Sequence, residues 1–213
     1  MNERTRIKIC GLRDPEHARI AANAGADAVG LVFYGKSPRN VQVHEAQAVV
    51  AALPPYVSAV GLFVDASAAE IGEVLAGLRL DLLQFQGDEP PEFCARFGIP
   101  YVRAVRMAPG VDLLECSRRF AGARALLLDA HVPGEAGGTG AAFDWTRIPR
   151  DLPIPVILSG GLTPGNVARA VREVKPWAVD VSSGVESTRG TKDPAKIVEF
   201  IRSVRREDAA TSR

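Results

Sequence analysis

The sequence predicts an α/β fold, and more specifically a single (β/α)8 barrel of the TIM type over residues 1–213. Eight short runs rich in Val, Ile and Leu alternate with longer amphipathic segments. Most of the short runs are apolar at successive positions, which is typical of parallel strands buried on both faces. An open doubly wound sheet has the same periodicity, but the count of eight favours closure into a barrel.

The eight apolar runs are the expected strands. They are Ile7–Cys10, Ala28–Phe33, Ser58–Val64, Leu80–Phe85, Tyr101–Val105, Ala125–Leu128, Ile154–Leu158 and Ala178–Val181. No Gly/Ser-rich linker and no shift in composition separates them. We therefore expect one domain.

The expected helices carry recognisable end signals. Asp14-Pro15 and Gly25 have the pattern of an N-cap, a proline at the first helical position and a C-cap. The other expected helices are Val43–Leu53, Ala66–Leu78, Pro90–Phe97, Asp112–Phe120, Thr163–Val174 and Asp193–Val204. After the sixth strand only a short segment near Phe143–Ile148 is a candidate, and 205–213 is expected to be a flexible tail.

The composition is that of an ordinary water-soluble globular protein. The chain is 46% hydrophobic, carries a net charge of +1 and contains three cysteines and three histidines. So small a charge gives no electrostatic reason to expect nucleic acid or an anionic membrane as a partner. The odd number of widely spaced cysteines predicts neither disulfides nor a metal site, and no signal peptide or membrane span is apparent, so we expect a cytoplasmic protein.

The chemistry of such a barrel lies where the strands end at their carboxyl termini. The seventh strand leads into Gly160-Gly161, and the eighth into Ser183-Gly184. Glycines let backbone N–H groups approach a ligand closely, and the loops after strands seven and eight are the recurrent phosphate site of the fold. We therefore predict that Gly160, Gly161, Ser183 and Gly184 bind a phosphate group.

Two further strand ends carry groups able to move protons. Cys10 ends the first strand, with Lys8 two residues earlier on the same side, where an ammonium group favours the thiolate. Asp129 follows the apolar sixth strand, where an unpaired carboxylate is costly unless it has a function. Each residue also has a simpler interpretation. Cys10 is then a small buried side chain, and Asp129 is a hydrogen-bond acceptor in a loop.

The chain resembles the phosphoribosylanthranilate isomerase family along nearly its whole length. The matching segments are Lys8–Gly11, Ser37–Arg39, Val60–Val64, Leu83–Gly87, Leu127–Asp129, Gly138–Gly140, Leu158–Leu162 and Asp180–Glu186, followed by Gly190, Lys192 and Asp193. Their order and their positions at strand ends make the resemblance specific.

The resemblance implies an Amadori rearrangement of N-(5-phosphoribosyl)anthranilate in tryptophan biosynthesis, without a cofactor. It implies that Cys10 is the general base and Asp129 the general acid, and that Arg39 binds the anthranilate carboxylate. Gln86 and Asp180 are expected to contact substrate. The family usually has histidine at the place of Gln86, and glutamine can hydrogen-bond but cannot titrate near neutrality.

Two alternatives stay open. Another phosphosugar barrel enzyme would share the glycine-containing strand ends but use different acid and base residues. A non-catalytic phospholigand-binding protein would keep Gly160, Gly161, Ser183 and Gly184 without needing both Cys10 and Asp129. In each case the expected partner is a small phosphosugar, and the chain is expected to be a monomer or a homodimer.

Overall fold

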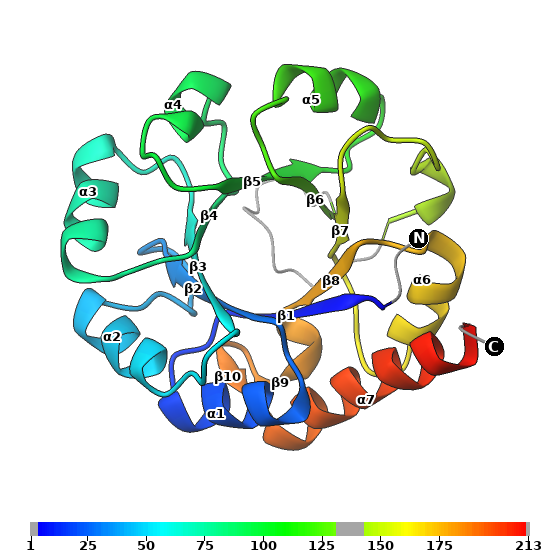
Figure 1. Cartoon of the computed structure of the whole chain (residues 1–213), viewed down its shortest axis with the longest axis horizontal. Helices are drawn as coiled ribbons and strands as arrows, with labels where there is room; N and C mark the ends of the chain where they lie inside the picture. Colours follow the sequence, from blue (N-terminus) through cyan, green and yellow to red (C-terminus); the bar gives the residue numbers. More distant parts are fainter. Residues whose placement is uncertain (1–3, 131–142, 212–213) are drawn as a thin grey trace.

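The structure is a closed barrel of eight parallel strands surrounded by helices (Figure 1), as the sequence predicts. It is a computed structural model that describes residues 4–130 and 143–211. Each strand pairs with the next along the chain, and the barrel closes where β8 pairs with β1. The strands are β1 (Arg6–Cys10), β2 (Ala28–Phe33), β3 (Ser58–Phe63), β4 (Leu82–Phe85), β5 (Tyr101–Arg106), β6 (Ala125–Asp129), β7 (Val156–Leu158) and β8 (Ala178–Val181).

The helices follow the strands in the expected order. They are α1 (Pro15–Ala24), α2 (Val43–Ala51), α3 (Ala68–Gly77), α4 (Pro91–Ala95), α5 (Leu113–Arg119), α6 (Val167–Val174) and α7 (Pro194–Thr211). The predicted caps of α1 are confirmed, since Asp14 accepts a hydrogen bond from the Glu16 N–H and Gly25 is left-handed with φ of 106°. Between β6 and β7 the sequence offers only a short helical candidate near Phe143–Ile148. In the described part of that segment, only the 3-10 turn η1 (Trp145–Arg147) forms.

Two expected helix boundaries differ from the structure by more than two residues. Helix α6 begins at Val167 rather than at Thr163, because the Asn166 side chain accepts a hydrogen bond from the Thr163 N–H and holds the preceding residues in a turn. The tail expected from Arg205 onward is helical to Thr211. Helix α7 packs against both α1 and α6, which lie on either side of it in Figure 1.

Polar contacts explain why the end of α7 is ordered. Arg205 donates hydrogen bonds to the carbonyl oxygens of Thr5 and Gly25. Asp208 accepts from both the N–H and the hydroxyl of Thr5, and Glu207 pairs with Arg172 of α6. The polar residues of this segment therefore fasten the last helix to its neighbours.

The barrel has two separate apolar regions because side chains alternate along each strand. One set, which includes Ile9, Leu31 and Phe63, packs against the surrounding helices. The other set faces the barrel axis, where Val102 and Leu127 belong to a small separate cluster. At the carboxyl ends of the strands, the residues that continue this inward-facing set point to the mouth of the barrel. No helix in the described ranges is both long and apolar enough to cross a membrane.

Candidate active site

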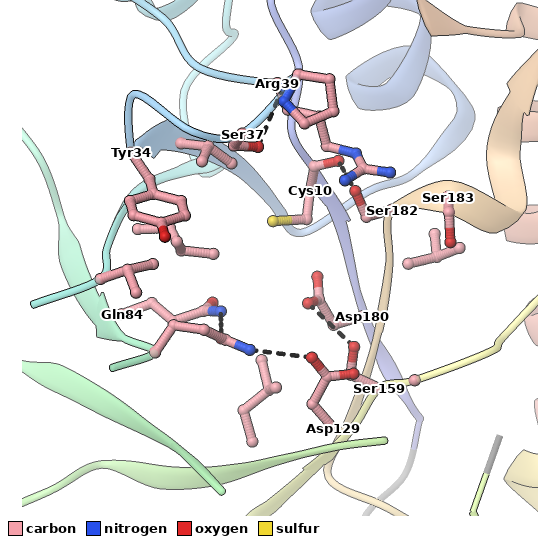
Figure 2. A pocket seen from close by; sticks show the side chains of 18 of the residues that line it. Cys10, Tyr34, Ser37, Arg39, Gln84, Asp129, Ser159, Asp180, Ser182 and Ser183 are labelled. Carbon is pink, nitrogen blue, oxygen red and sulfur yellow. Dashed lines mark hydrogen bonds between the residues drawn. The ribbon is translucent and has the colours of Figure 1, made fainter. Parts of the chain in front are cut away.

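A cavity of about 230 Å³ opens at the carboxyl ends of the strands. Eight of the predicted site residues line it: Cys10, Arg39, Gln86, Asp129, Gly160, Gly161, Asp180 and Ser183. Figure 2 shows that the Cys10 thiol and the Asp129 carboxyl point into this cavity from different strands. Gly184 does not line the cavity, although its neighbour Ser183 does.

Cys10 lies beside a buried ion pair. The Lys8 ammonium is 2.8 Å from Asp180 Oδ1, and both side chains face the barrel interior. Burial raises the pKa of the Cys10 thiol, and this effect together with the negative charge of Asp180 outweighs the lowering effect of Lys8 and Lys192. The expectation that Lys8 favours the thiolate is correct in direction, but the resting pKa of Cys10 is raised because the thiol is buried and Lys8 is shared with Asp180.

Asp129 is buried at the end of β6 and holds its proton unusually tightly. Burial and the nearby Asp180 charge raise the pKa of Asp129 to about 6. Two donors favour its charged form: the Ala130 N–H at 2.9 Å from Oδ1 and the Gln86 amide at 3.0 Å from Oδ2. A carboxyl group with this pKa can act as an acid near neutral pH.

Arg39 is held by a bidentate pair with Glu186, at the start of the strand β9 (Glu186–Thr188). Arg39 Nε lies 2.7 Å and Nη2 3.0 Å from the two Glu186 oxygens. Lys192, in the strand β10 (Thr191–Lys192), also contacts Glu186, at 2.8 Å, and donates to the Ser182 hydroxyl. Although burial opposes ionisation, these cations hold the pKa of Glu186 below its usual range.

The hydrogen-bonded cluster of Arg39, Glu186, Lys192 and Ser182 also contacts the first strand. The Ser182 hydroxyl donates to the Cys10 carbonyl oxygen at 3.1 Å, as Figure 2 shows. The Arg39 guanidinium therefore has a fixed orientation at the edge of the cavity, close to the loop that follows β8.

The loops after β7 and β8 have a tight backbone. Gly160 and Gly161 adopt left-handed conformations, with φ of 78° and 67°. A Cβ atom at Gly160 would lie 2.5 Å from the Ala130 nitrogen, and one at Gly184 would overlap the Leu162 carbonyl oxygen. Within residues 4–130 and 143–211, neither Gly160 nor Gly161 donates a backbone hydrogen bond to another main-chain group. These N–H groups are suited to an anionic ligand.

An apolar wall faces the polar groups across the cavity. It consists of Val32 and Tyr34 from the β2 side and Leu62 and Val64 from the β3 side, packed around Cys10. The exposed cations Lys36 and Arg189 also line the cavity. The site therefore combines an apolar wall, an acid and a thiol, and cations that attract an anionic ligand.

The sequence analysis did not single out three of the polar groups in this arrangement. Gln84 bonds to Gln86 at 2.9 Å, Ser159 lies 3.5 Å from Asp180, and Ser182 contacts Cys10. Each is two residues from a predicted site residue or directly beside one, so the two-residue period of a strand was a usable signal. His131 and the Gly138–Gly140 motif lie outside the described residues.

Comparisons with known proteins agree with this geometry. The family model described as N-(5'-phosphoribosyl)anthranilate (PRA) isomerase matches residues 7–203. The chain is 56% identical over 200 residues to the N-(5'-phosphoribosyl)anthranilate isomerase of Pseudomonas aeruginosa, covering 94% of this chain and 95% of that protein. It is 57% identical over 196 residues to that of Thiobacillus denitrificans, covering 92% and 96%.

Solved structures show the same likeness. The phosphoribosyl anthranilate isomerase of Thermotoga maritima has a TM-score of 0.85 and 38% identity, covering 94% of this chain and 98% of that chain. A phosphoribosyl anthranilate isomerase in complex with reduced 1-(o-carboxyphenylamino)-1-deoxyribulose 5-phosphate has a TM-score of 0.82 and 37% identity over the same shares. With a family model matched over most of its length, this chain belongs to the N-(5'-phosphoribosyl)anthranilate isomerase family.

Proposed function

We propose that this protein converts N-(5-phosphoribosyl)anthranilate into 1-(2-carboxyphenylamino)-1-deoxyribulose 5-phosphate, with Asp129 as general acid and Cys10 as general base. The reaction is an Amadori rearrangement in tryptophan biosynthesis. The observation that carries the proposal is a buried carboxyl with a pKa of about 6 in the same cavity as a buried thiol. A phosphoribosyl anthranilate isomerase that binds the reduced product in its crystal structure shares this fold at 37% identity.

The chemistry divides between these two groups. Neutral Asp129 protonates the furanose ring oxygen, and the ring opens to an iminium ion. The Cys10 thiolate then removes the proton from the sugar C2, which gives an enamine that tautomerises to the ketone. Both proton transfers are supplied by the chain's own side chains, so the proposal needs no cofactor.

The surroundings suggest how the substrate lies. The phosphate would bind to the N–H groups of Gly160 and Gly161 and to the turn η2 (Ser183–Val185). The anthranilate carboxylate would pair with Arg39, whose guanidinium Glu186 already orients. Asp180 and Gln86, which also line the cavity, would lie beside the sugar.

The direct test is an activity assay. Purified protein is mixed with freshly generated phosphoribosylanthranilate, and loss of the anthranilate-type fluorescence is followed over time. Cys10→Ser should be nearly inactive, because a serine hydroxyl is far harder to deprotonate than a thiol. Cys116→Ser is the matched control, since Cys116 lies on α5 away from the cavity.

Two results would contradict the proposal. If the protein binds a phosphosugar analogue but does not consume the substrate, it is a phospholigand-binding protein. If Cys10→Ser turns over as fast as Cys116→Ser, another group is the base. We expect the enzyme to act in the cytoplasm, as a monomer or a homodimer.

A further inference from the structure

A chain of hydrogen bonds runs along β4 to the buried carboxyl of Asp129. Gln84 and Gln86 are two residues apart and therefore face the same side of the strand. Their side chains are only 2% and 5% exposed. Gln84 Nε2 donates to Gln86 Oε1 at 2.9 Å, and Gln86 Nε2 donates to Asp129 Oδ2 at 3.0 Å. Figure 2 shows these bonds as a continuous line of side chains.

We propose that Gln84 is a positioning residue that orients the Gln86 amide so that its NH2 group faces Asp129. An amide side chain has a donating end and an accepting end. Because the Gln86 oxygen accepts from Gln84, the Gln86 nitrogen is the end that meets the carboxyl. If the amide were turned around, its oxygen would face Asp129 and would bond only to the protonated acid.

The orientation matters because it acts on the proton of Asp129. A donor from Gln86 favours the ionised carboxylate and works against burial and Asp180, which raise the pKa of Asp129 to about 6. A neutral amide also keeps its donor across the whole pH range in which Asp129 titrates. A histidine at this position would itself titrate in that range.

Other charged groups face Asp129 but do not depend on Gln84. Asp180 of β8 and Lys8 of β1 act on it through space, and Cys10 of β1 lines the same cavity. Arg106 of β5 pairs in register with Asp129 and donates to the Gln86 backbone oxygen. A substitution at Gln84 leaves all of these charges in place, and we expect its effect on Asp129 to pass through Gln86.

The inference rests on the proposed function for its catalytic meaning, but it can be tested without turnover. The pKa of Asp129 is measured by carboxyl carbon NMR of aspartate-labelled protein, with its signal assigned from Asp129→Asn. In Gln86→Met and in Gln84→Met we expect this pKa to rise by roughly half to one pH unit, the scale of one hydrogen bond. Gln47→Met is the matched control, since the Gln47 amide bonds to the Gly77 carbonyl oxygen far from the cavity.

A double-mutant cycle separates positioning from a direct effect. In protein that already carries Gln86→Met, adding Gln84→Met should not raise the pKa of Asp129 further. Gln84→Leu serves in the same cycle if Gln84→Met does not fold. An unchanged Asp129 pKa in a folded Gln84 variant, or an equal shift with and without Gln86, overturns the inference.

The pH dependence of kcat/KM then connects the inference to catalysis. The limb that Asp129 controls should move with the NMR titration in each variant. If the carboxyl titration moves and the rate profile does not, then the acid assignment of Asp129 is wrong while the positioning by Gln84 stands.

Discussion

Replacing Asp129 with asparagine tests the acid and base assignments together, because it removes the titrating proton and keeps the shape of the side chain. In the resting protein, burial and Asp180 raise the pKa of Asp129 to about 6. Burial raises the pKa of Cys10 above its ordinary value. The reaction needs a neutral acid and a thiolate base, which is the opposite of the resting distribution near neutral pH.

The shape of the pH profile follows from the order of the two pKa values, with Asp129 below Cys10. At a pH between the pKa of Asp129 and that of Cys10, raising the pH by one unit gives tenfold more thiolate and tenfold less neutral carboxyl. The fraction of molecules that has both catalytic forms is therefore constant in this range. Because the pKa of Cys10 is raised while that of Asp129 is about 6, only a small fraction of molecules has the thiolate and the neutral carboxyl at the same time. The acidic limb of kcat/KM, near pH 6, therefore belongs to Asp129, and the alkaline limb belongs to Cys10.

The assay is kcat/KM from about pH 5 to about pH 10 for the wild type and Asp129→Asn. The variant should lose the break near pH 6, so that kcat/KM goes on rising with pH until Cys10 is ionised, and it should lose about 10²–10⁴-fold of its rate, the usual contribution of a general acid. Asp14→Asn is the control, because asparagine caps a helix as well as aspartate does. An Asp129→Asn profile that keeps the break near pH 6, or that keeps the wild-type rate, would refute the reasoning.

Four further predictions concern stability and binding. Because the pKa of Asp129 is raised from about 3.9 in the unfolded chain to about 6, its charge destabilises the fold fully above pH 6, and this cost disappears as the pH falls below about 3.9. Asp129→Asn should therefore raise the unfolding free energy by up to about 3 kcal/mol at pH 7 but leave it unchanged at about pH 3.5; equal thermal melts of the two proteins at pH 7 would contradict this. Arg39→Ala should weaken binding of the reduced product by roughly 1.5–3 kcal/mol, but should not weaken binding of an analogue without the carboxylate, and calorimetry with both ligands decides the matter. It should also lower the melting temperature, because it leaves Glu186 beside Lys192 without its bidentate partner. Gly184→Ala should reduce affinity for inorganic phosphate, because its Cβ would displace the loop from the Leu162 carbonyl oxygen, whereas Gly72→Ala, which has open space on α3, should bind phosphate as the wild type does.

Local sequence patterns were enough to predict the elements of the barrel. The strands are apolar at successive positions because both of their faces are covered, and this holds for each strand independently of its partners. The helix ends at Asp14 and Gly25 were readable because caps are made by neighbouring residues. Given the order of the strands, the carboxyl ends that carry Cys10, Asp129 and Gly160 had to meet at one mouth.

What only the tertiary structure decided is how those groups act on one another. The sequence placed Lys8 beside Cys10, but not the Asp180 carboxylate that shares Lys8, nor the burial that keeps the thiol protonated. It predicted Arg39 and Glu186 in separate motifs, yet only folding brings these side chains, 147 positions apart, into one bidentate pair. Proton affinities and hydrogen-bond orientations depend on desolvation and on charges from distant parts of the chain, and neither is encoded in any local pattern.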